Sequence, residues 1–192
     1  MDRIEVTSLL KLDRTFYARP GIDVSKSLLG AIMCRRIGGI VRRARIIETE
    51  AYLGPKDLAS HSSKGRTLRT EVMFGEAGHA YVYFIYGMHY MFNIVAGNTG
   101  EAHAILIRAA QPLDEWQIDL TGPAKFARGF EITRDDNSMD LTSGEISLFA
   151  DPAYRPKIIR TRRIGIDYAR HWKNRLLRFI DVSNPASAKL WR

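Results

Sequence analysis

Two glutamates in the segment IETEAY have a spacing that suits acid–base chemistry. If this segment is a β-strand, alternate residues point to one face, so that Glu48, Glu50 and Tyr52 lie together. Two acidic side chains on one face are commonly just solvated. Here they follow the apolar pair Ile46–Ile47 and precede a Gly-Pro break, where a strand can enter a site. A carboxylate in a closed pocket can have a raised pKa and can take a proton from water.

An aromatic run, YVYFIYGMHYMFNIV at 81–95, is the second candidate. It holds four of the eight tyrosines of the chain, arranged around Gly87. Aromatic residues of strands are usually buried, which predicts a core position for Tyr81, Phe84, Tyr90 and Phe92. Tyr86 differs, because a large ring beside the glycine of a hairpin tip is hard to bury within its own domain. On a basic protein such a ring suits a wedge or a stacking platform for bases, with burial in the core as the alternative.

The charge of the chain favours a polyanionic partner. The net charge is +8 and the isoelectric point is about 9.8, whereas the hydrophobic and charged fractions of 45% and 26% are ordinary for a globular protein. A basic surface favours nucleic acid first and an acidic membrane surface second. The basic residues are clustered, on a first hairpin (Arg35, Arg36, Arg42, Arg43, Arg45), after His61 (Lys64, Arg66, Arg69) and from Arg155 to Arg178.

Dispersed arginines usually form a solvated face, but basic clusters on loops beside a candidate pocket fit phosphate contacts better. Lys125 opens a candidate helix after Gly122-Pro123, where its ammonium group and the free backbone N–H groups can share one phosphate.

Other chemistries find little support. Cys34 is the only cysteine, so no disulfide forms within the chain, and nothing requires an oxidising compartment. The histidines are scattered without cysteine partners, which predicts no zinc site, and His103 is expected to be structural. The acidic stretch DDNSMD lacks the glycine of a calcium loop at its sixth position, so a solvated turn is expected. No Gly-rich phosphate loop and no GxSxG elbow occur.

The location expected from the sequence is cytoplasmic, nucleoid-associated in a prokaryote and nuclear in a eukaryote. The N-terminal stretch MDRIEVTSLLKLDR has neither the apolar core nor the cleavage site of a signal peptide. The aromatic run is shorter than the roughly 20 residues that a membrane-spanning helix needs, and it contains polar side chains. No membrane partner is therefore expected.

The elements that must position these residues are mostly strands. A short helix at 21–30 is expected, with Asp23 or Ser25 as its cap. Segments 31–36 and 40–54 predict a hairpin around Gly38–Gly39, and 54–70 predicts a polar loop with one helical turn after Asp57.

Further strands are predicted at 80–86, at 89–95 and from 102 to Arg108. A helix with Pro123 in its first turn, a loop followed by a strand at 135–149, and mixed structure at 161–182 complete the chain. The prediction is an α+β fold: one domain over residues 1–192, built on a curved, open-barrel-like antiparallel sheet with surrounding helices and a protruding β-hairpin.

Taken together, these stretches resemble the alkyladenine (3-methyladenine) DNA glycosylases of the mammalian alkylpurine type. The likeness covers nearly the whole chain, and ETEAYLGP followed by YVYFIYGMHYMFN is its most specific part. In chain order it is carried by ARPGIDVSKSLLG, RIIETEAYLGPKDLASHSSKGRT, MFGEAGHAYVYFIYGMHYMFNIV, AILIRAAQPL, LTGPAKF and RRIGI with LLRF.

The resemblance implies a base-excision-repair enzyme that flips damaged purines out of double-stranded DNA and hydrolyses their N-glycosidic bond. Substrates of the 3-methyladenine, hypoxanthine and ethenoadenine class are implied, with no metal and no cofactor, an abasic product and a monomeric enzyme. Glu50 matches the general base, and Arg108 and the backbone carbonyl of Ile164 match groups that hold the attacking water. Glu48 is expected to be structural.

The remaining site residues are also carried over from the family. Tyr52, His61 and Tyr83 match the aromatic slot for the flipped base, the backbone around Ala59 and His61 would read its edge, and Asn93 would exclude guanine. Tyr86 matches the intercalating tyrosine, with Met88 and His89 beside it in the groove. The phosphate contacts would come from Lys64, Arg66, Arg69 and Lys125.

Some positions depart from the family pattern. Only DEWQIDLT separates Leu113 from the GPAKF motif, which predicts a missing or shortened helix, and RTLRT replaces the usual RTPRN. Two alternatives remain: a catalytically silent nucleic-acid-binding module on the same scaffold, and an unrelated basic β-domain in which the aromatic hairpin is core. Glu50, Arg108 and Tyr86 together argue against the first, because binding alone does not need the carboxylate.

Overall fold

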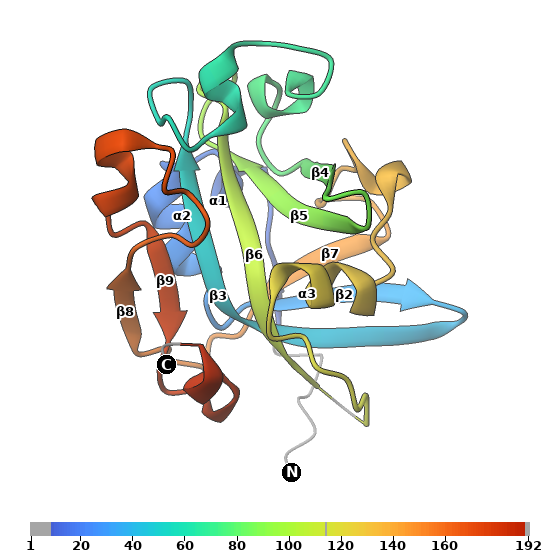
Figure 1. The fold of residues 1–192 in the computed structure, drawn as a ribbon. Coiled ribbons are helices and arrows are strands. Elements are labelled where there is room, and N and C mark those ends of the chain that lie inside the picture. The colour runs from blue at the N-terminus through green and yellow to red at the C-terminus, as the bar shows by residue number, and fades with distance from the viewer. Residues whose placement is uncertain (1–8, 114, 191–192) are drawn as a thin grey trace.

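A computed structural model describes residues 9–113 and 115–190 and shows an α+β domain built on one large antiparallel sheet (Figure 1). The strands of this sheet are β1 (Leu10–Lys11), β2 (Ile32–Ile37), β3 (Ile40–Leu53), β4 (Ala80–Ile85), β5 (His89–Ala96), β6 (His103–Pro112), β7 (Ile146–Ala150), β8 (Ile158–Thr161) and β9 (Arg178–Asp181).

The helices are few and short. The α-helices are α1 (Arg14–Tyr17), α2 (Gly21–Ser27) and α3 (Pro123–Gly129). The 3-10 helices are η2 (His61–Lys64), η3 (Glu71–Phe74), η4 (Arg134–Asp136), η5 (Arg170–Asn174) and η6 (Pro185–Lys189). No helix among the described residues is long and apolar enough to cross a membrane.

The strand order is β1-β7-β2-β3-β6-β5-β4, with β9 pairing β3 and β8 pairing β9. Strands β1 and β4 are the ends of this path and do not pair with each other, so the sheet is not closed into a barrel. The long central strand β3 pairs with β6 on one side, and with β2 and then β9 on the other. Its residues 44–51 are all buried, which places IETEAY at the centre of the protein.

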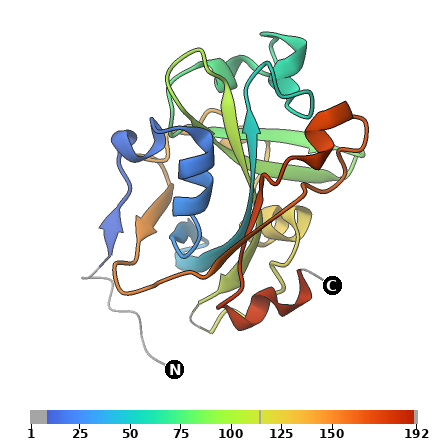
Figure 2. The same cartoon turned by 90° about the vertical axis from the view of Figure 1, so that its left-hand side faces the viewer.

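The α-helices cover the sheet from two sides. Helix α2 packs against β3 and β6, and α3 packs against β5 and β6. Figure 1 draws α2 behind the sheet and α3 in front of it, and the side view in Figure 2 separates the two helices to either side of β3. Fully buried side chains of these helices and of the residues that follow them, among them Val24, Leu28, Phe126 and Phe130, join those of the sheet in the main core.

Most local predictions are confirmed. The hairpin β2–β3 turns at Gly38 and Gly39, whose φ angles of 54° and 81° favour glycine. The hairpin β4–β5 has the predicted strands, and α3 begins at Pro123. Among the described residues no helix lies between β6 and α3, as the short DEWQIDLT segment predicts, although Asp114 is outside the description.

Other predictions are wrong in detail. Helix α2 begins at Gly21 after Pro20, and buried Ser25 hydrogen-bonds Thr49 at 2.9 Å, so neither Asp23 nor Ser25 caps it. Strand β6 continues past Arg108 to Pro112 because pairing with β3 extends there. The helical turn expected after Asp57 is present as the 3-10 helix η2.

Phe84 is 42% exposed instead of core, because it lies near the hairpin tip, where its ring contacts that of Tyr90. The DDNSMD stretch is not a solvated turn either. Asp136 is buried in an ion pair with Arg35 at 2.9 Å, and Asp140 pairs with Arg14 at 2.8 Å. Arg45 of the first basic cluster is likewise buried and pairs with Asp151. Most of the N-terminal stretch MDRIEVTSLLKLDR, for which the sequence predicts no signal peptide, lies outside the described residues.

Candidate active site

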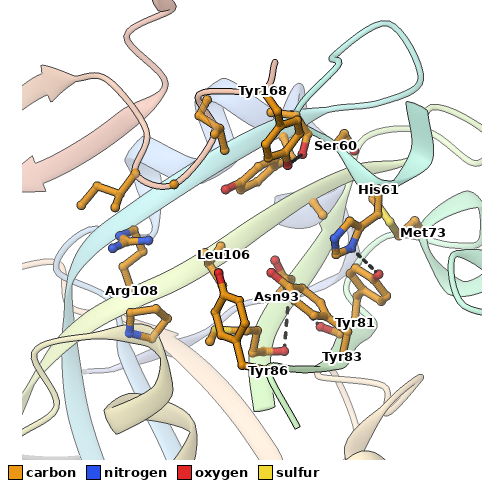
Figure 3. A pocket seen from close by; sticks show the side chains of 18 residues that line it. Ser60, His61, Met73, Tyr81, Tyr83, Tyr86, Asn93, Leu106, Arg108 and Tyr168 are labelled. Carbon is orange, nitrogen blue, oxygen red and sulfur yellow. Dashed lines mark hydrogen bonds between the residues drawn. The ribbon is translucent and has the colours of Figure 1, made fainter. Parts of the chain in front are cut away.

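A cavity of about 270 Å³ opens where β3, β4, β5 and β6 meet the loops around η2 and before η5. Figure 3 shows Arg108 at one end of this cavity and His61 with Met73 at the other. It is lined by side chains from segments far apart in the chain: Tyr52, Ala59, Ser60, His61, Met73, Tyr81, Tyr83, Tyr86, Met91, Asn93, Ala104, Leu106, Arg108, Pro123, Ile164, Gly165, Ile166 and Tyr168.

Glu50 contacts three of the lining residues, Tyr52, Arg108 and Ile164, and is itself 0% exposed. Its Oε1 accepts the backbone N–H of Ile164 at 2.9 Å and lies 3.4 Å from Nε of Arg108. Its Oε2 accepts the hydroxyl of Tyr52 at 2.8 Å. The structure thus joins the predicted Glu50, Arg108 and Ile164, with Ile164 contributing its N–H group.

The environment of Glu50 favours a proton acceptor. Burial raises the pKa of its carboxyl group, and this effect outweighs the lowering by Arg108, the Ile164 N–H and the Tyr52 hydroxyl, while Glu48 raises it further. A carboxylate offers about four acceptor positions, and the Ile164 N–H and the Tyr52 hydroxyl use two of them. A base with a raised pKa that is hydrogen-bonded on both oxygens is well suited to take a proton from water.

Arg108 reaches this position through an irregularity in the sheet. On β3, Glu48 pairs with Ala109 and Thr49 pairs with Ile107, so Arg108 has no residue opposite it. Such bulges re-aim a side chain near functional sites. The Nε of Arg108 contacts Glu48 at 2.9 Å, and the residue lines the cavity. Burial alone would lower the pKa of Arg108, but Glu50 and Glu48 keep it raised and the group charged.

Aromatic rings form the cavity wall opposite Arg108. The rings of His61 and Tyr83 meet edge to face at 4.6 Å, and Nδ1 of His61 is 2.8 Å from the hydroxyl of Tyr81. Burial lowers the pKa of His61 to about 4, and the charge of Arg69 acts in the same direction. The imidazole is therefore neutral at physiological pH and adds no positive charge of its own to the wall.

The polar end of this wall is fixed by Asn93, which is buried on β5. Its side-chain amide donates to the carbonyl of Tyr81 at 3.0 Å, a hydrogen bond drawn in Figure 3. Ala59 also lines the cavity, so all five predicted base-pocket residues (Tyr52, Ala59, His61, Tyr83, Asn93) come together. The resulting slot has flat apolar walls with a few fixed polar groups, which suits a planar heterocycle.

Tyr86 occupies the tip of the β4–β5 hairpin with 80% of its surface exposed. Its φ angle of 54° is unusual for a residue other than glycine, and the following Gly87 has a φ of 67°. The tight turn thus directs a large ring away from the core and to the rim of the cavity. Met88 is also exposed, and neither Met88 nor His89 lines the cavity.

The residues predicted to contact phosphates lie outside the cavity. Arg66 pairs with Glu71 at 2.5 Å, and Lys125 pairs with Asp119 at 2.7 Å; all four side chains are largely exposed. Arg69 lies 5.2 Å from the ring centre of Tyr83, behind the base slot. Lys64 is exposed. Exposed ion pairs are weak, so these cations remain able to exchange partners.

Sequence reasoning missed the ion pair that joins the two loops of the cavity. Asp57 accepts both Nη groups of Arg163, at 2.5 and 2.9 Å, and also the backbone N–H groups of Leu53 and Ala59 at 3.0 Å. Both side chains are fully buried. Their 106 positions of separation leave no local signal of the pairing. Tyr168 and Met73 were likewise not anticipated as lining residues.

No group of three or more His, Cys, Asp or Glu side chains is arranged to hold a metal ion in the part of the chain that the structure describes. The site combines a planar slot, a buried carboxylate beside an arginine and an exposed aromatic side chain at a hairpin tip. The family model for methylpurine-DNA glycosylase matches residues 15–185.

Curated relatives agree over almost the full length. A protein of Legionella pneumophila (strain Corby) is 45% identical over 181 residues, 93% of this chain and 98% of its own. One from Anaeromyxobacter sp. (strain Fw109-5) is 44% identical over 171 residues, 88% of each chain. One from Clostridium botulinum (strain Alaska E43) is 42% identical, covering 82% of this chain and 89% of its own. Each carries the name "Putative 3-methyladenine DNA glycosylase".

The chain belongs to the methylpurine-DNA glycosylase family. It is a DNA glycosylase, a hydrolase of N-glycosyl bonds that serves the base excision repair of alkylated purines, and its substrate is damaged DNA.

Proposed function

We propose that the chain is a monofunctional 3-methyladenine DNA glycosylase that uses Glu50 as its general base on double-stranded DNA. The observation that supports this most directly is the buried Glu50 carboxylate, fixed by Ile164, Tyr52 and Arg108 at one end of a slot lined by aromatic rings. A module that only bound nucleic acid would gain nothing from a charge buried behind its base slot.

The proposed reaction is hydrolysis at C1′ of the flipped nucleotide. The C1′–N bond breaks and its electron pair leaves with the base, while the oxygen of a water molecule attacks C1′ and gives one proton to Glu50. A nucleoside of 3-methyladenine carries a positive charge, so its base leaves as a neutral molecule and needs no general acid. The sugar becomes cationic as the bond breaks, and the negative charge of Glu50 stabilises it.

We assign the base slot to Tyr52, His61 and Tyr83, with Asn93 and the backbone at Ala59 reading the edge of the base. Neutral His61 permits a cationic base to enter, since a charged imidazole would repel it. Hypoxanthine and ethenoadenine fit the same planar slot and are proposed as further substrates.

The DNA is held from outside the slot. Tyr86 intercalates where the flipped nucleotide leaves a gap, with Met88 and His89 beside it in the groove. Stacking of one ring offsets part of the few kcal/mol that extrusion costs. The phosphate contacts are assigned to Lys64, Arg66, Arg69 and Lys125. We further propose that residues 1–192 act as one glycosylase domain and as a monomer, because one cavity and one duplex require nothing more.

The test uses end-labelled duplexes that contain one hypoxanthine, one ethenoadenine or one methylated purine, incubated with the wild type and with Glu50→Gln. We expect strand cleavage at the lesion only after alkali, since a monofunctional enzyme leaves an abasic site intact. The Glu50→Gln variant is expected to lose excision by at least about 100-fold, within the range of general-base catalysis, and to retain DNA binding. Tight binding without excision of any lesion by the wild type would instead support a silent binding module.

A further inference from the structure

Glu48 is buried two residues before Glu50 on β3, and a single oxygen of its carboxylate serves two arginines. Its Oε1 accepts Nε of Arg108 at 2.9 Å and Nε of Arg178 at 2.5 Å. The Glu48 side chain is only 2% exposed, so these contacts are shielded from solvent. Arg178 lies on the neighbouring strand β9 and is anchored at its other end by the carbonyl of Leu190 at 2.7 Å.

The contact at Nε determines where the rest of Arg108 points. Because Nε is held by Glu48, the Nη groups project away from Glu48. Within residues 9–113 and 115–190 these Nη groups have no hydrogen-bond partner. They are not sealed off from solvent either, because Arg108 lines the cavity. The guanidinium group therefore offers free donors to the space beside Glu50. A rotation of Arg108 would withdraw them.

The buried charges also balance. Glu48 and Glu50 carry two negative charges, and Arg108 and Arg178 carry two positive ones. Glu48 is one of the causes that raise the pKa of Glu50, through like-charge repulsion. Its removal leaves an excess positive charge beside the base, and a positive environment favours the ionised carboxylate.

We propose that Glu48 is a positioning residue for catalysis, which fixes Arg108 toward the cavity beside Glu50 without touching the substrate. This inference rests on the proposed role of Glu50 and goes beyond a structural role for Glu48. A merely structural carboxylate would affect the amount of folded enzyme, whereas this one also affects the pH at which the enzyme works.

The groups that interact with Glu50 come from several strands and one loop. Tyr52 and Glu48 come from β3, Arg108 from β6 and Arg178 from β9, and Tyr83 from β4 also senses the charge of Glu50. The loop before η5 contributes the N–H of Ile164. Of these, Glu48 alone is a second carboxylate. Its neutralisation removes a repulsion that raises the pKa of Glu50, whereas a displacement of Arg108 would remove a positive charge that lowers it.

The experiment compares the pH profile of kcat/KM for the wild type and Glu48→Gln on a duplex with one lesion. The acid limb of this profile reports the base of the free enzyme. For Glu48→Gln we expect the acid limb to move to lower pH as long as Arg108 remains beside the cavity, because loss of the repulsion from Glu48 lets the pKa of Glu50 fall. The plateau is expected to drop roughly 10- to 100-fold, since a misplacement of about 1 Å can cost this much.

Two further variants separate positioning from folding. Asp136→Asn removes a buried carboxylate that pairs with Arg35 away from the cavity, so it should lower thermal stability and leave the acid limb in place. Glu48→Asp keeps the charge but has a shorter reach to Arg108. It should keep the limb near that of the wild type while lowering the plateau.

The outcomes are distinct. A wild type that excises no lesion contradicts the proposed function itself. An active wild type, with a Glu48→Gln variant that equals it in both the plateau and the acid limb of kcat/KM, overturns the inference but does not contradict the role of Glu50. If Glu48→Gln does not fold, Glu48→Asp decides: a plateau equal to that of the wild type overturns the positioning role, and a reduced plateau at normal folded fraction supports it.

Discussion

The buried ion pair between Asp57 and Arg163 offers a sharp test of how the cavity is held together. Asp57 receives four hydrogen bonds, two from Arg163 and one each from the backbone N–H groups of Leu53 and Ala59. Arg163 directly precedes Ile164, so this carboxylate joins the loop that carries Ala59 to the loop that contacts Glu50. In Asp57→Asn the amide group turns a donor toward either Arg163 or a backbone N–H.

The cost follows from the charge that remains. Removal of one partner leaves a buried cation without compensation, which typically costs about 3–5 kcal/mol. Arg163 keeps a bond to the carbonyl of Ala51 at 2.9 Å and lies 4.6 Å from the ring centre of Tyr52, so we expect the lower end, about 3 kcal/mol. At about 2–4 °C per kcal/mol for a domain of this size, the melting temperature should fall by roughly 6–12 °C.

Thermal melts followed by circular dichroism measure this change, and Asp167→Asn is the matched control. Asp167 is an exposed acid on the same loop as Arg163, so its neutralisation changes the net charge equally and should shift the melting temperature by less than about 1 °C. Excision by folded Asp57→Asn should also fall, because the backbone at Ala59 and Ile164 is no longer tied together. A melting temperature within about 2 °C of the wild type would refute the reasoning.

Two other substitutions test the site directly. Tyr52→Phe removes a hydrogen bond that lowers the pKa of Glu50, so we expect this pKa to rise. The acid limb of kcat/KM should then move to higher pH, opposite to the shift expected from Glu48→Gln. An unmoved limb would mean that the Tyr52 hydroxyl does not act on the base. Tyr86→Ala deletes an exposed ring and should change the free energy of unfolding by less than about 0.5 kcal/mol. It should nevertheless lower excision from duplex DNA by about 10-fold or more, as expected for the loss of about 1–3 kcal/mol of stacking. Equal excision by wild type and Tyr86→Ala would contradict the wedge.

Sequence reasoning was most successful where the information is local. Alternation along β3 correctly put Glu48, Glu50 and Tyr52 on one side, because the pleat of a strand fixes side-chain direction. The glycines at 38 and 39 predicted their turn because positive φ angles are costly for other residues. The residues assigned by family resemblance to the base slot also come together, although their roles stay predictions.

The errors arise where distant segments decide the environment. The acids of DDNSMD look solvated by composition, but Arg35, about 100 positions earlier, buries Asp136. Phe84 has the type and spacing of a core residue, and only the three-dimensional structure shows that it lies near the hairpin tip and stays 42% exposed. The bulge at Arg108 has no marker in the sequence, because it depends on the register between β3 and β6.

The register irregularity lies beside three buried charged side chains, Glu48, Glu50 and Arg178, and the partly buried Arg108. In a regular ladder, the neighbours Ile107 and Arg108 would point to opposite faces and each would have a residue opposite it on β3. With Arg108 left unpaired, Ile107 stays fully buried in the core while Arg108 reaches Glu48 and the cavity. An arginine buried without a carboxylate would destabilise the fold, so the bulge and Glu48 depend on each other. Insertion or deletion of one residue in β6 near 108 should therefore abolish folding as well as catalysis, whereas a similar change beyond Leu113 should not.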